Sequence, residues 1–341
     1  MLRQLARLTR PLPAAGAGAL AIAVYGSDAD LPIAAAESGF EGVACVDDAA
    51  RACELLCDVW AATGLAAVRE WAEGLLQFVL WMEDGDGRWL NFVLDWHGRR
   101  NRGGLTSAAG ANFWQARALN ALAAAWTVLG DEAAERALRG GLKVAVDAEC
   151  PADVRALHVQ AALRLLRHRS DPELLSLLSL WCDQLASCRR GVLLLNSAAE
   201  DGVPHLWGHV QEAVLAEAAV LLGRPELLSL ARASAEALFS GLIESGFAAE
   251  HVQPYGVQMA VEAMDRLHAA TGDPAHQRLA GLAREWFHGR NPAGVPVYDQ
   301  TEGRVADGID GGVLNSHSGA ESNIAAGMAL FGDACHSARL V

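Results

Sequence analysis

The sequence lacks both a long uninterrupted apolar stretch and an excess of basic charge. No apolar run in its 341 residues reaches the roughly 20 residues that a membrane-spanning helix needs, so we expect no membrane insertion. The formal net charge at pH 7 is -14, and the basic residues are scattered or interleaved with acidic ones. Because nucleic-acid binding needs a basic patch, we expect no nucleic-acid partner.

Paired cysteine motifs are also missing. The seven cysteines contain no Cys-x-x-Cys pair, which is typical of reduced core thiols in a cytosolic protein. An N-terminal arginine-bearing segment followed by apolar residues 11–24 loosely resembles a signal peptide, but Pro and Gly interrupt it. We therefore expect a cytoplasmic protein. The cysteines are Cys45, Cys53, Cys57, Cys150, Cys182, Cys188 and Cys335.

No Pro/Ser linker or charge block divides the chain, and strand signals are scarce. Hydrophobic residues make up 52%, many of them Ala and Leu, which favour helices. The pattern predicts one all-α domain over 1–341, with 1–40 forming an N-terminal helix (Leu2 to Leu8) and an irregular arm. Residues 295–298 are a candidate short strand. The stretch 116–129 is apolar on nearly all sides, which predicts burial on more than one face.

Polar or glycine-rich loops precede every second helical stretch. These openings are spaced by about 40 to 65 residues, and such a repeat predicts an (α/α)6 toroid of six helical hairpins. The openings should gather at one rim, where helix N-termini favour a polar ligand. The predicted pairs are 47–63 with 65–82, 112–129 with 131–146, 152–168 with 172–188, 207–222 with 225–243, 254–271 with 274–287, and 318–331 with the N-terminal helix.

Acidic side chains open the first hairpin. Asp47 and Asp48 are adjacent, and Arg51 lies at i+4 from Asp47, where an ion pair can form. One interpretation is a helix cap with an ion pair, since Asp caps helices well. The other is that one carboxylate caps and its neighbour points into a pocket, because two adjacent carboxylates seldom both cap. Glu41 precedes them.

The second and fourth openings combine aromatic and hydrogen-bonding side chains. Trp114 suits stacking against a sugar ring, or else packs in the core, and Gln115 and Arg117 follow it. His209 and Glu212 are spaced i and i+3, so they share a helix face as an acid–base pair or as a hydrogen-bonded cap.

The last opening is the densest in polar residues. Glu321 lies in the first turn of its predicted helix, where it either caps or acts on a substrate. Asp299, Asp307 and Asp310 carry carboxylates of the kind that bind calcium, but they lack regular ligand spacing. We therefore expect no metal and no other cofactor.

Three of these stretches resemble a bacterial group of the six-hairpin, (α/α)6-barrel glycosidase-like superfamily. They are 39–52, which contains Asp47-Asp48-Ala49-Ala50-Arg51-Ala52 and is similar to the group's Asp-Asp-x-Ala-Arg-Ala element, 113–119 and 318–322. The resemblance covers nearly the whole chain and implies the barrel fold. It leaves the reaction open, because the superfamily includes hydrolases, lyases and epimerases. In addition, 208–212 is similar to the Gly-His-x-x-Glu element of N-acylglucosamine and cellobiose 2-epimerases.

The leading hypothesis is a carbohydrate-active enzyme that hydrolyses a glycosidic bond in a saccharide. This chemistry needs two carboxyl groups, for which we select Asp48 and Glu321, with Asp47 in reserve. The alternatives are a sugar 2-epimerase that uses His209 with His251 or His317, and a non-catalytic saccharide-binding or scaffold barrel. The predicted substrate-binding residues are Glu41, Arg51, Trp114, Gln115, Arg117, Trp207, His209, Glu212, Tyr255, Asp310 and His317.

Overall fold

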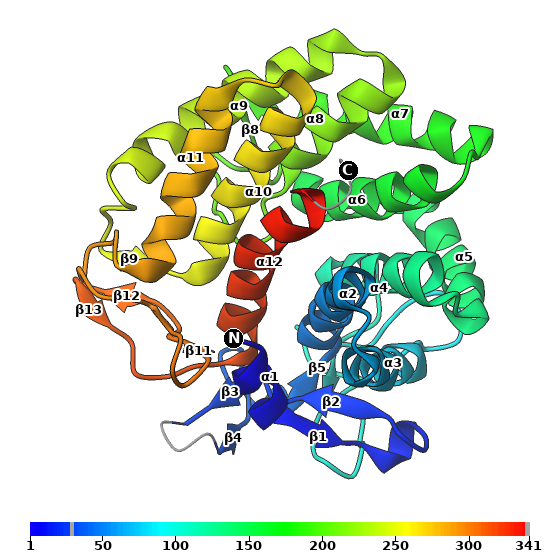
Figure 1. The fold of residues 1–341 in the computed structure, drawn as a ribbon. Coiled ribbons are helices and arrows are strands. Elements are labelled where there is room, and N and C mark those ends of the chain that lie inside the picture. Colours follow the sequence, from blue (N-terminus) through cyan, green and yellow to red (C-terminus); the bar gives the residue numbers. More distant parts are fainter. Residues whose placement is uncertain (28–30, 338–341) are drawn as a thin grey trace. The chain divides into compact units, whose positions relative to one another are not determined.

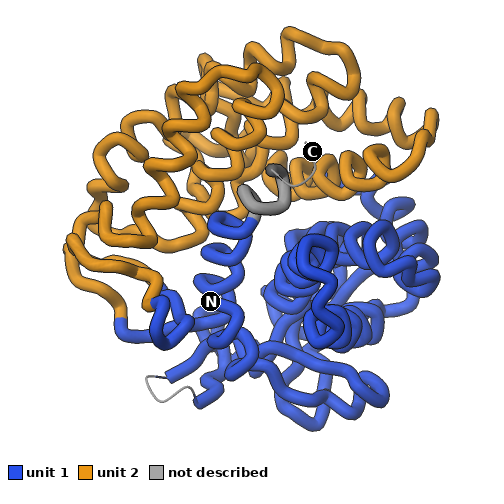
Figure 2. Tube along the Cα trace, viewed as in Figure 1, with its two compact units in different colours: residues 1–149, 300–307, 316–341 blue, residues 150–299, 308–315 orange. Residues whose placement is uncertain are grey.

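The computed structural model describes residues 1–27 and 31–337 (Figure 1). The side chains from residue 332 onward, and with them the predicted core thiol Cys335, lie outside the described residues. The chain divides into two compact units, which we call unit 1 (1–149, 300–307 and 316–341) and unit 2 (150–299 and 308–315) (Figure 2). That they form a single domain stays a prediction. In the described part of the chain, every helix is too short or too polar to cross a membrane.

Unit 1 contains the first two helical hairpins and the last long helix. Its hairpins are α2 with α3 and α4 with α5, and α1 packs against α12. The helices are α1 (Leu2–Leu8), α2 (Val46–Thr63), α3 (Ala66–Trp81), α4 (Phe113–Ala124), α5 (Glu132–Asp147) and α12 (Ala320–Ser337), with the short helices η1 (Pro13–Ala15) and η2 (Ala125–Leu129).

The first helices of the unit 1 hairpins form its buried layer. Helix α2 packs against both α4 and α12. Every residue of α4 from Gln115 to Ala124 is buried, whereas α5 buries only Ala134, Leu138, Gly141 and Ala145. The expectation that 116–129 is buried on several faces is thus confirmed for α4. Its last part differs, because 125–129 continue as a π-helical turn, and of these residues only Ala125 is buried.

Short strands connect the helices of unit 1. Strand β1 (Thr9–Pro11) pairs with β2 (Leu20–Ile22), β3 (Tyr25–Gly26) with β4 (Pro32–Ile33), and β5 (Ala44–Cys45) with β6 (Phe92–Val93), all antiparallel. Strand β11 (Arg304–Val305) belongs to the segment 300–307 of this unit. The predicted arm is therefore not irregular. Its β1–β2 hairpin is turned at Gly16 and Gly18, whose positive φ angles an L side chain rarely adopts.

Unit 2 contains the three middle hairpins. They are α6 (Ala152–His168) with α7 (Pro172–Ser187), α8 (Gln211–Leu222) with α9 (Pro225–Glu244), and α10 (Pro254–Thr271) with α11 (Pro274–Arg284). The first helices again pack in series, because α8 lies against both α6 and α10. The remaining elements are β7 (Arg189–Arg190), β8 (Leu193–Leu194), β9 (His251–Val252), η3 (Glu285–His288), β10 (Tyr298–Asp299), β12 (Ile309–Asp310) and β13 (Val313–Leu314).

All six predicted helical pairs are present, and the main boundary error is at α8. This helix begins at Gln211 rather than at Trp207, so Trp207 and His209 belong to the preceding loop. The candidate strand at 295–298 is also displaced, since β10 covers Tyr298–Asp299.

Candidate active site

The start of α2 is built by strand β5, which runs directly into it. Cys45 ends the strand and occupies the N-cap position of the helix in an extended conformation, and its sulfur accepts a hydrogen bond from the Asp48 amide at 3.4 Å. Asp47 and Asp48 follow within the first turn. The capping part of both interpretations is therefore wrong, because Cys45 holds the cap position and neither carboxylate accepts an amide of the first turn.

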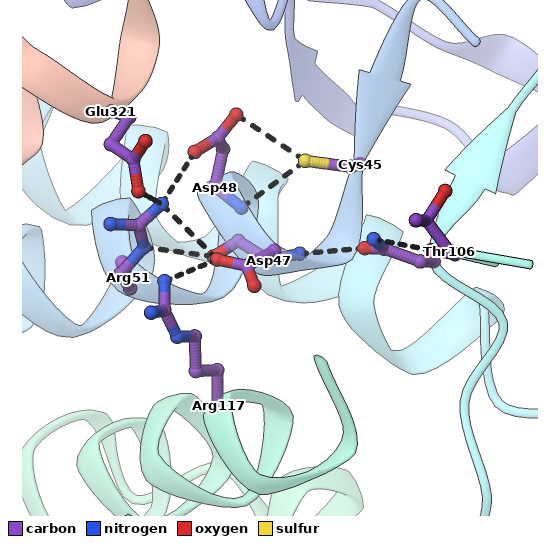
Figure 3. Close-up of polar contacts among 8 residues, drawn as sticks. Cys45, Asp47, Asp48, Arg51, Thr106, Arg117 and Glu321 are labelled. Atoms are coloured by element: carbon purple, nitrogen blue, oxygen red, sulfur yellow. Dashed lines mark hydrogen bonds and ion pairs between the residues drawn. The ribbon is translucent and has the colours of Figure 1, made fainter. Parts of the chain in front are cut away.

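One nitrogen of Arg51 joins three carboxylates. Its Nη2 lies 2.8 Å from Asp48 Oδ1, 3.1 Å from Asp47 Oδ1 and 3.0 Å from Glu321 Oε1. Figure 3 shows these side chains pointing toward one another from the first turns of α2 and α12. The predicted ion pair of Asp47 with Arg51 is confirmed, and Glu321 lies in a first helical turn as expected.

A second guanidinium, from α4, completes the cluster. Arg117 donates to Asp47 Oδ1 (Figure 3). Its Cζ lies 5.7 Å from the centre of the Phe113 ring. Two cations thus face three carboxyl groups. Because one carboxyl lacks a compensating cation, the cluster favours binding one proton.

Burial distinguishes the two carboxyl groups selected as catalytic. The Asp48 side chain is 4% exposed and that of Glu321 is 31% exposed. Burial raises the pKa of Asp48 to about 7, with Glu321 and Asp47 adding to the rise and Arg51 opposing it. Burial also disfavours the charged form of Arg117 and so lowers the pKa of its guanidinium group. At neutral pH Asp48 therefore retains a proton in a large fraction of molecules.

Glu41 uses both of its side-chain oxygens within the protein. Its Oε1 accepts a hydrogen bond from the Thr106 hydroxyl, and its Oε2 accepts one from the Glu37 amide at 3.0 Å. The bond to Thr106 connects the segment after β4 to the loop after β6, and the bond to Glu37 lies within the former segment.

Trp114 and Gln115 form hydrogen bonds that favour the packing interpretation. The indole N–H of Trp114 donates to the carbonyl of Trp89 at 2.8 Å. The buried Gln115 amide donates to the carbonyl of Gly141 in α5 at 3.1 Å. Their predicted part in sugar binding stays a prediction.

His209 and Glu212 are in contact, but inside unit 2. Nε2 of His209 lies 2.9 Å from Glu212 Oε2, and Nδ1 lies 2.6 Å from Asn196 Oδ1. Ser234 donates to Glu212 Oε1 at 2.6 Å. Both side chains of the pair are completely buried, so this arrangement favours a packed polar network over an acid–base pair that reaches a ligand.

The remaining predicted binding residues occupy varied positions. Trp207 and Tyr255 are half-buried in unit 2, in the loop before α8 and in the first turn of α10. Asp310 is exposed on β12, where its Oδ1 lies 3.0 Å from His251 Nδ1. His317 is exposed in unit 1, and its carbonyl accepts a hydrogen bond from the Asp307 amide at 2.9 Å.

Two residues of the candidate site were missed by sequence reasoning. Cys45 is directly before the acidic pair, so its position was a usable signal. Asn91, whose side-chain oxygen accepts a hydrogen bond from the Asp47 amide at 3.1 Å, is distant in sequence and carries no motif. Across the described residues, no group of three His, Cys, Asp or Glu side chains is arranged to hold a metal ion.

Comparison with solved structures identifies the fold. The cellobiose 2-epimerase from Bacillus thermoamylovorans has a TM-score of 0.73 at 11% identity, with 98% of this chain and 96% of that chain covered. A D-mannose isomerase has a TM-score of 0.70 at 11% identity, covering 93% and 91%. A GH76 α-mannanase from Bacteroides thetaiotaomicron has a TM-score of 0.62 at 12% identity, covering 92% and 93%.

These likenesses show that the chain has the all-α, (α/α)6 fold that the hairpin pattern predicts. No family model matches the sequence, and no curated protein matches it either. Because the identities are so low, function has to be argued from the side chains of the site.

Proposed function

We propose that this protein is a carbohydrate-active enzyme that hydrolyses a glycosidic bond, with Asp48 and Glu321 as its catalytic carboxyl groups. The observation that carries the proposal is their meeting at a single nitrogen of Arg51 in two different environments. Asp48 is buried with a raised pKa of about 7, whereas Glu321 is partly open to solvent. Glycoside hydrolysis uses two carboxyl groups whose environments favour the protonated form of one and the ionised form of the other.

The separation of the two groups favours a double displacement. Asp48 Oδ1 and Glu321 Oε1 both contact the same Arg51 nitrogen, at 2.8 and 3.0 Å, so these oxygens are no more than about 6 Å apart. Retaining glycosidases keep their carboxyl groups about 5 to 5.5 Å apart, whereas inverting ones need about 6.5 to 9.5 Å for a water. A retaining mechanism is therefore the better match.

In that mechanism the proton of Asp48 passes to the oxygen of the leaving group as the glycosidic bond breaks. The carboxylate of Glu321 forms a bond to the anomeric carbon, giving a glycosyl ester. Asp48, now ionised, takes a proton from water, which cleaves the ester and releases the sugar. Because Asp48 has to begin protonated, turnover should fall as the pH rises above about 7.

Asp47 has a supporting part in this proposal. Its Oδ1 accepts from both Arg51 and Arg117, so it holds the two guanidinium groups beside the reacting carboxyls. This ion pairing leaves Asp47 as the reserve rather than as the first choice for direct chemistry.

The epimerase alternative finds less support in the side chains. It requires His209 to exchange a proton with a sugar, but both ring nitrogens are engaged and the side chain is fully buried. The folds of a cellobiose 2-epimerase and a D-mannose isomerase are nevertheless similar to this one, so isomerised products belong in any assay.

The test is to incubate a saccharide library with the wild type, Asp48→Asn, Glu321→Gln and the control Asp58→Asn. Asp58 is an acidic residue further along α2, outside the first turn. Products that have gained one water, formed by the wild type and the control but lost in both site variants, would support the proposal. An isomeric product without mass change would favour the epimerase, and no product at all would favour a binding or scaffold protein.

A further inference from the structure

The backbone amides at the start of α2 donate to acceptors other than the Asp47 and Asp48 carboxylates. The first amides of a helix have no intrahelical partners. Here the amide of Val46 donates to the carbonyl of Asn91 at 2.8 Å, and that of Asp47 donates to Asn91 Oδ1 at 3.1 Å. The third, from Asp48, goes to the sulfur of Cys45. Asn91 thus caps two amides of a helix to which it does not belong.

The side chain of Asn91 is fixed in the orientation that this cap requires. Asn91 directly precedes β6, which pairs with β5, and it is buried. Its Nδ2 donates to the carbonyl of Thr106 and its own amide to the carbonyl of Ser107, both at 3.0 Å. Because the nitrogen faces Thr106, the side-chain oxygen is directed to the Asp47 amide.

Three other helices of this chain are capped by an aspartate whose carboxylate accepts a backbone amide. Asp131, Asp171 and Asp273 occupy the N-cap positions of α5, α7 and α11, one residue before each helix, and each accepts a first-turn amide at 2.8 to 3.0 Å. Asp47 and Asp48 do not, and their carboxylates extend to Arg51 and Arg117 instead. Because Asn91 accepts the first amides of α2, these amides do not compete for the Asp47 and Asp48 carboxylates.

We propose that Asn91 is a positioning residue of the candidate active site, which caps α2 from the loop between α3 and α4 and thereby keeps Asp47 on the two guanidinium groups. The inference rests on the proposed function for its catalytic meaning, but its geometry can be tested separately. Without the Asn91 oxygen, the Asp47 amide competes for the nearest carboxylate. Asp47 then withdraws from Arg117, and the carboxyl cluster loses its arrangement.

Two variants separate the cap from general packing. Asn91→Ala removes the oxygen that accepts the Asp47 amide. Asn91→Asp keeps such an oxygen and, assayed at acidic pH where its carboxyl is protonated, donates its hydroxyl to the Thr106 carbonyl in place of the nitrogen. The control is Asn101→Ala, in the same loop. Asn101 is also a buried asparagine, but its side chain bonds to Glu41 and to loop amides rather than to α2.

The first readout is turnover of a saccharide that the wild type hydrolyses. Since small misplacements of catalytic groups cost large factors in rate, we expect Asn91→Ala to lower kcat at least about tenfold with KM changed by less than about threefold. We expect Asn91→Asp to stay within about threefold of the wild-type kcat. The control should lower thermal stability while leaving kcat per folded molecule unchanged.

The second readout does not depend on activity. In ¹⁵N NMR spectra, the guanidinium signals of Arg117 should shift and exchange faster in Asn91→Ala, and remain wild-type-like in Asn91→Asp and Asn101→Ala. Unchanged Arg117 signals in Asn91→Ala would overturn the inference, as would equal losses in both Asn91 variants. If no preparation hydrolyses any saccharide, the proposed function fails while this spectrum still decides the role of Asn91.

Discussion

Replacing Asp48 by Asn should change how the stability of the protein depends on pH. Asn imitates the protonated carboxyl, because its oxygen can accept from Arg51 while its nitrogen donates toward the Cys45 sulfur. The wild-type group lies 2.8 Å from Arg51 Nη2 and 3.3 Å from Cys45 Sγ, so both of its oxygens have partners suited to the substitution. Unlike Asp, Asn does not titrate.

The size of the effect follows from the raised pKa. Burial raises the pKa of Asp48 from 3.8 to about 7 in the folded state. Between these values the folded protein keeps a proton that the unfolded chain has lost, so the free energy of unfolding falls as the pH rises through this window. A shift of about three units at 1.36 kcal/mol per unit amounts to about 4 kcal/mol. This stability is fully present below about pH 4 and lost above about pH 7.

Urea unfolding of the wild type and of Asp48→Asn between pH 4 and pH 8 measures this difference. Groups titrating alike in both proteins cancel, so the advantage of Asp48→Asn should grow by about 4 kcal/mol from the acidic to the basic end. Asp58→Asn, on the same helix, should show no such trend. A difference between Asp48→Asn and the wild type that does not change with pH would show that the pKa of Asp48 is not raised in the folded protein.

Four further substitutions, at three positions, test the surroundings of the same group. Arg51→Met leaves three carboxyls without their shared cation, and should lower the free energy of unfolding by about 3 to 5 kcal/mol in urea titrations; a loss under about 1 kcal/mol would contradict the ion-pair assignment. Gly42→Ala places a Cβ 2.3 Å from the Val93 carbonyl at a φ of +157°, and should cost about 1 to 3 kcal/mol by the same assay, whereas an unchanged urea midpoint would speak against the strained close approach. Cys45→Ser supplies a stronger donor to the Asp48 carboxylate and should lower its pKa, and Cys45→Ala removes the donor and should raise it; carbon NMR titrations that move in the same direction would count against this hydrogen bond.

The helical framework was predictable because its signals are local. Prolines stand at the first position of α7, α9, α10 and α11, and glycines in left-handed conformation end α2, α8 and α10. Apolar periodicity then identifies the stretches between them. The two-residue strands had no comparable signal, since a period of two cannot be recognised over so short a length.

The candidate site was predictable only where its contacts are local or where a resemblance supplied them. Asp47 and Arg51 are one helical turn apart, so their ion pair followed from spacing. Glu321 was selected through family resemblance together with its place in a first turn. The pairing of Arg117 with Asp47 and the cap from Asn91 depend on chain segments meeting in space. The burial of His209 was equally unpredictable, because its i,i+3 spacing with Glu212 carries no information about solvent exposure.

The most direct test of the central claim is the incubation of the saccharide library with wild-type protein in water enriched in heavy oxygen. Mass spectrometry would then locate the label in each product, with Asp48→Asn and Glu321→Gln measured in parallel. We expect a labelled new reducing end that forms with the wild type, decreases as the pH rises above about 7, and disappears in both variants. Label incorporation that persists in Asp48→Asn and Glu321→Gln would contradict it.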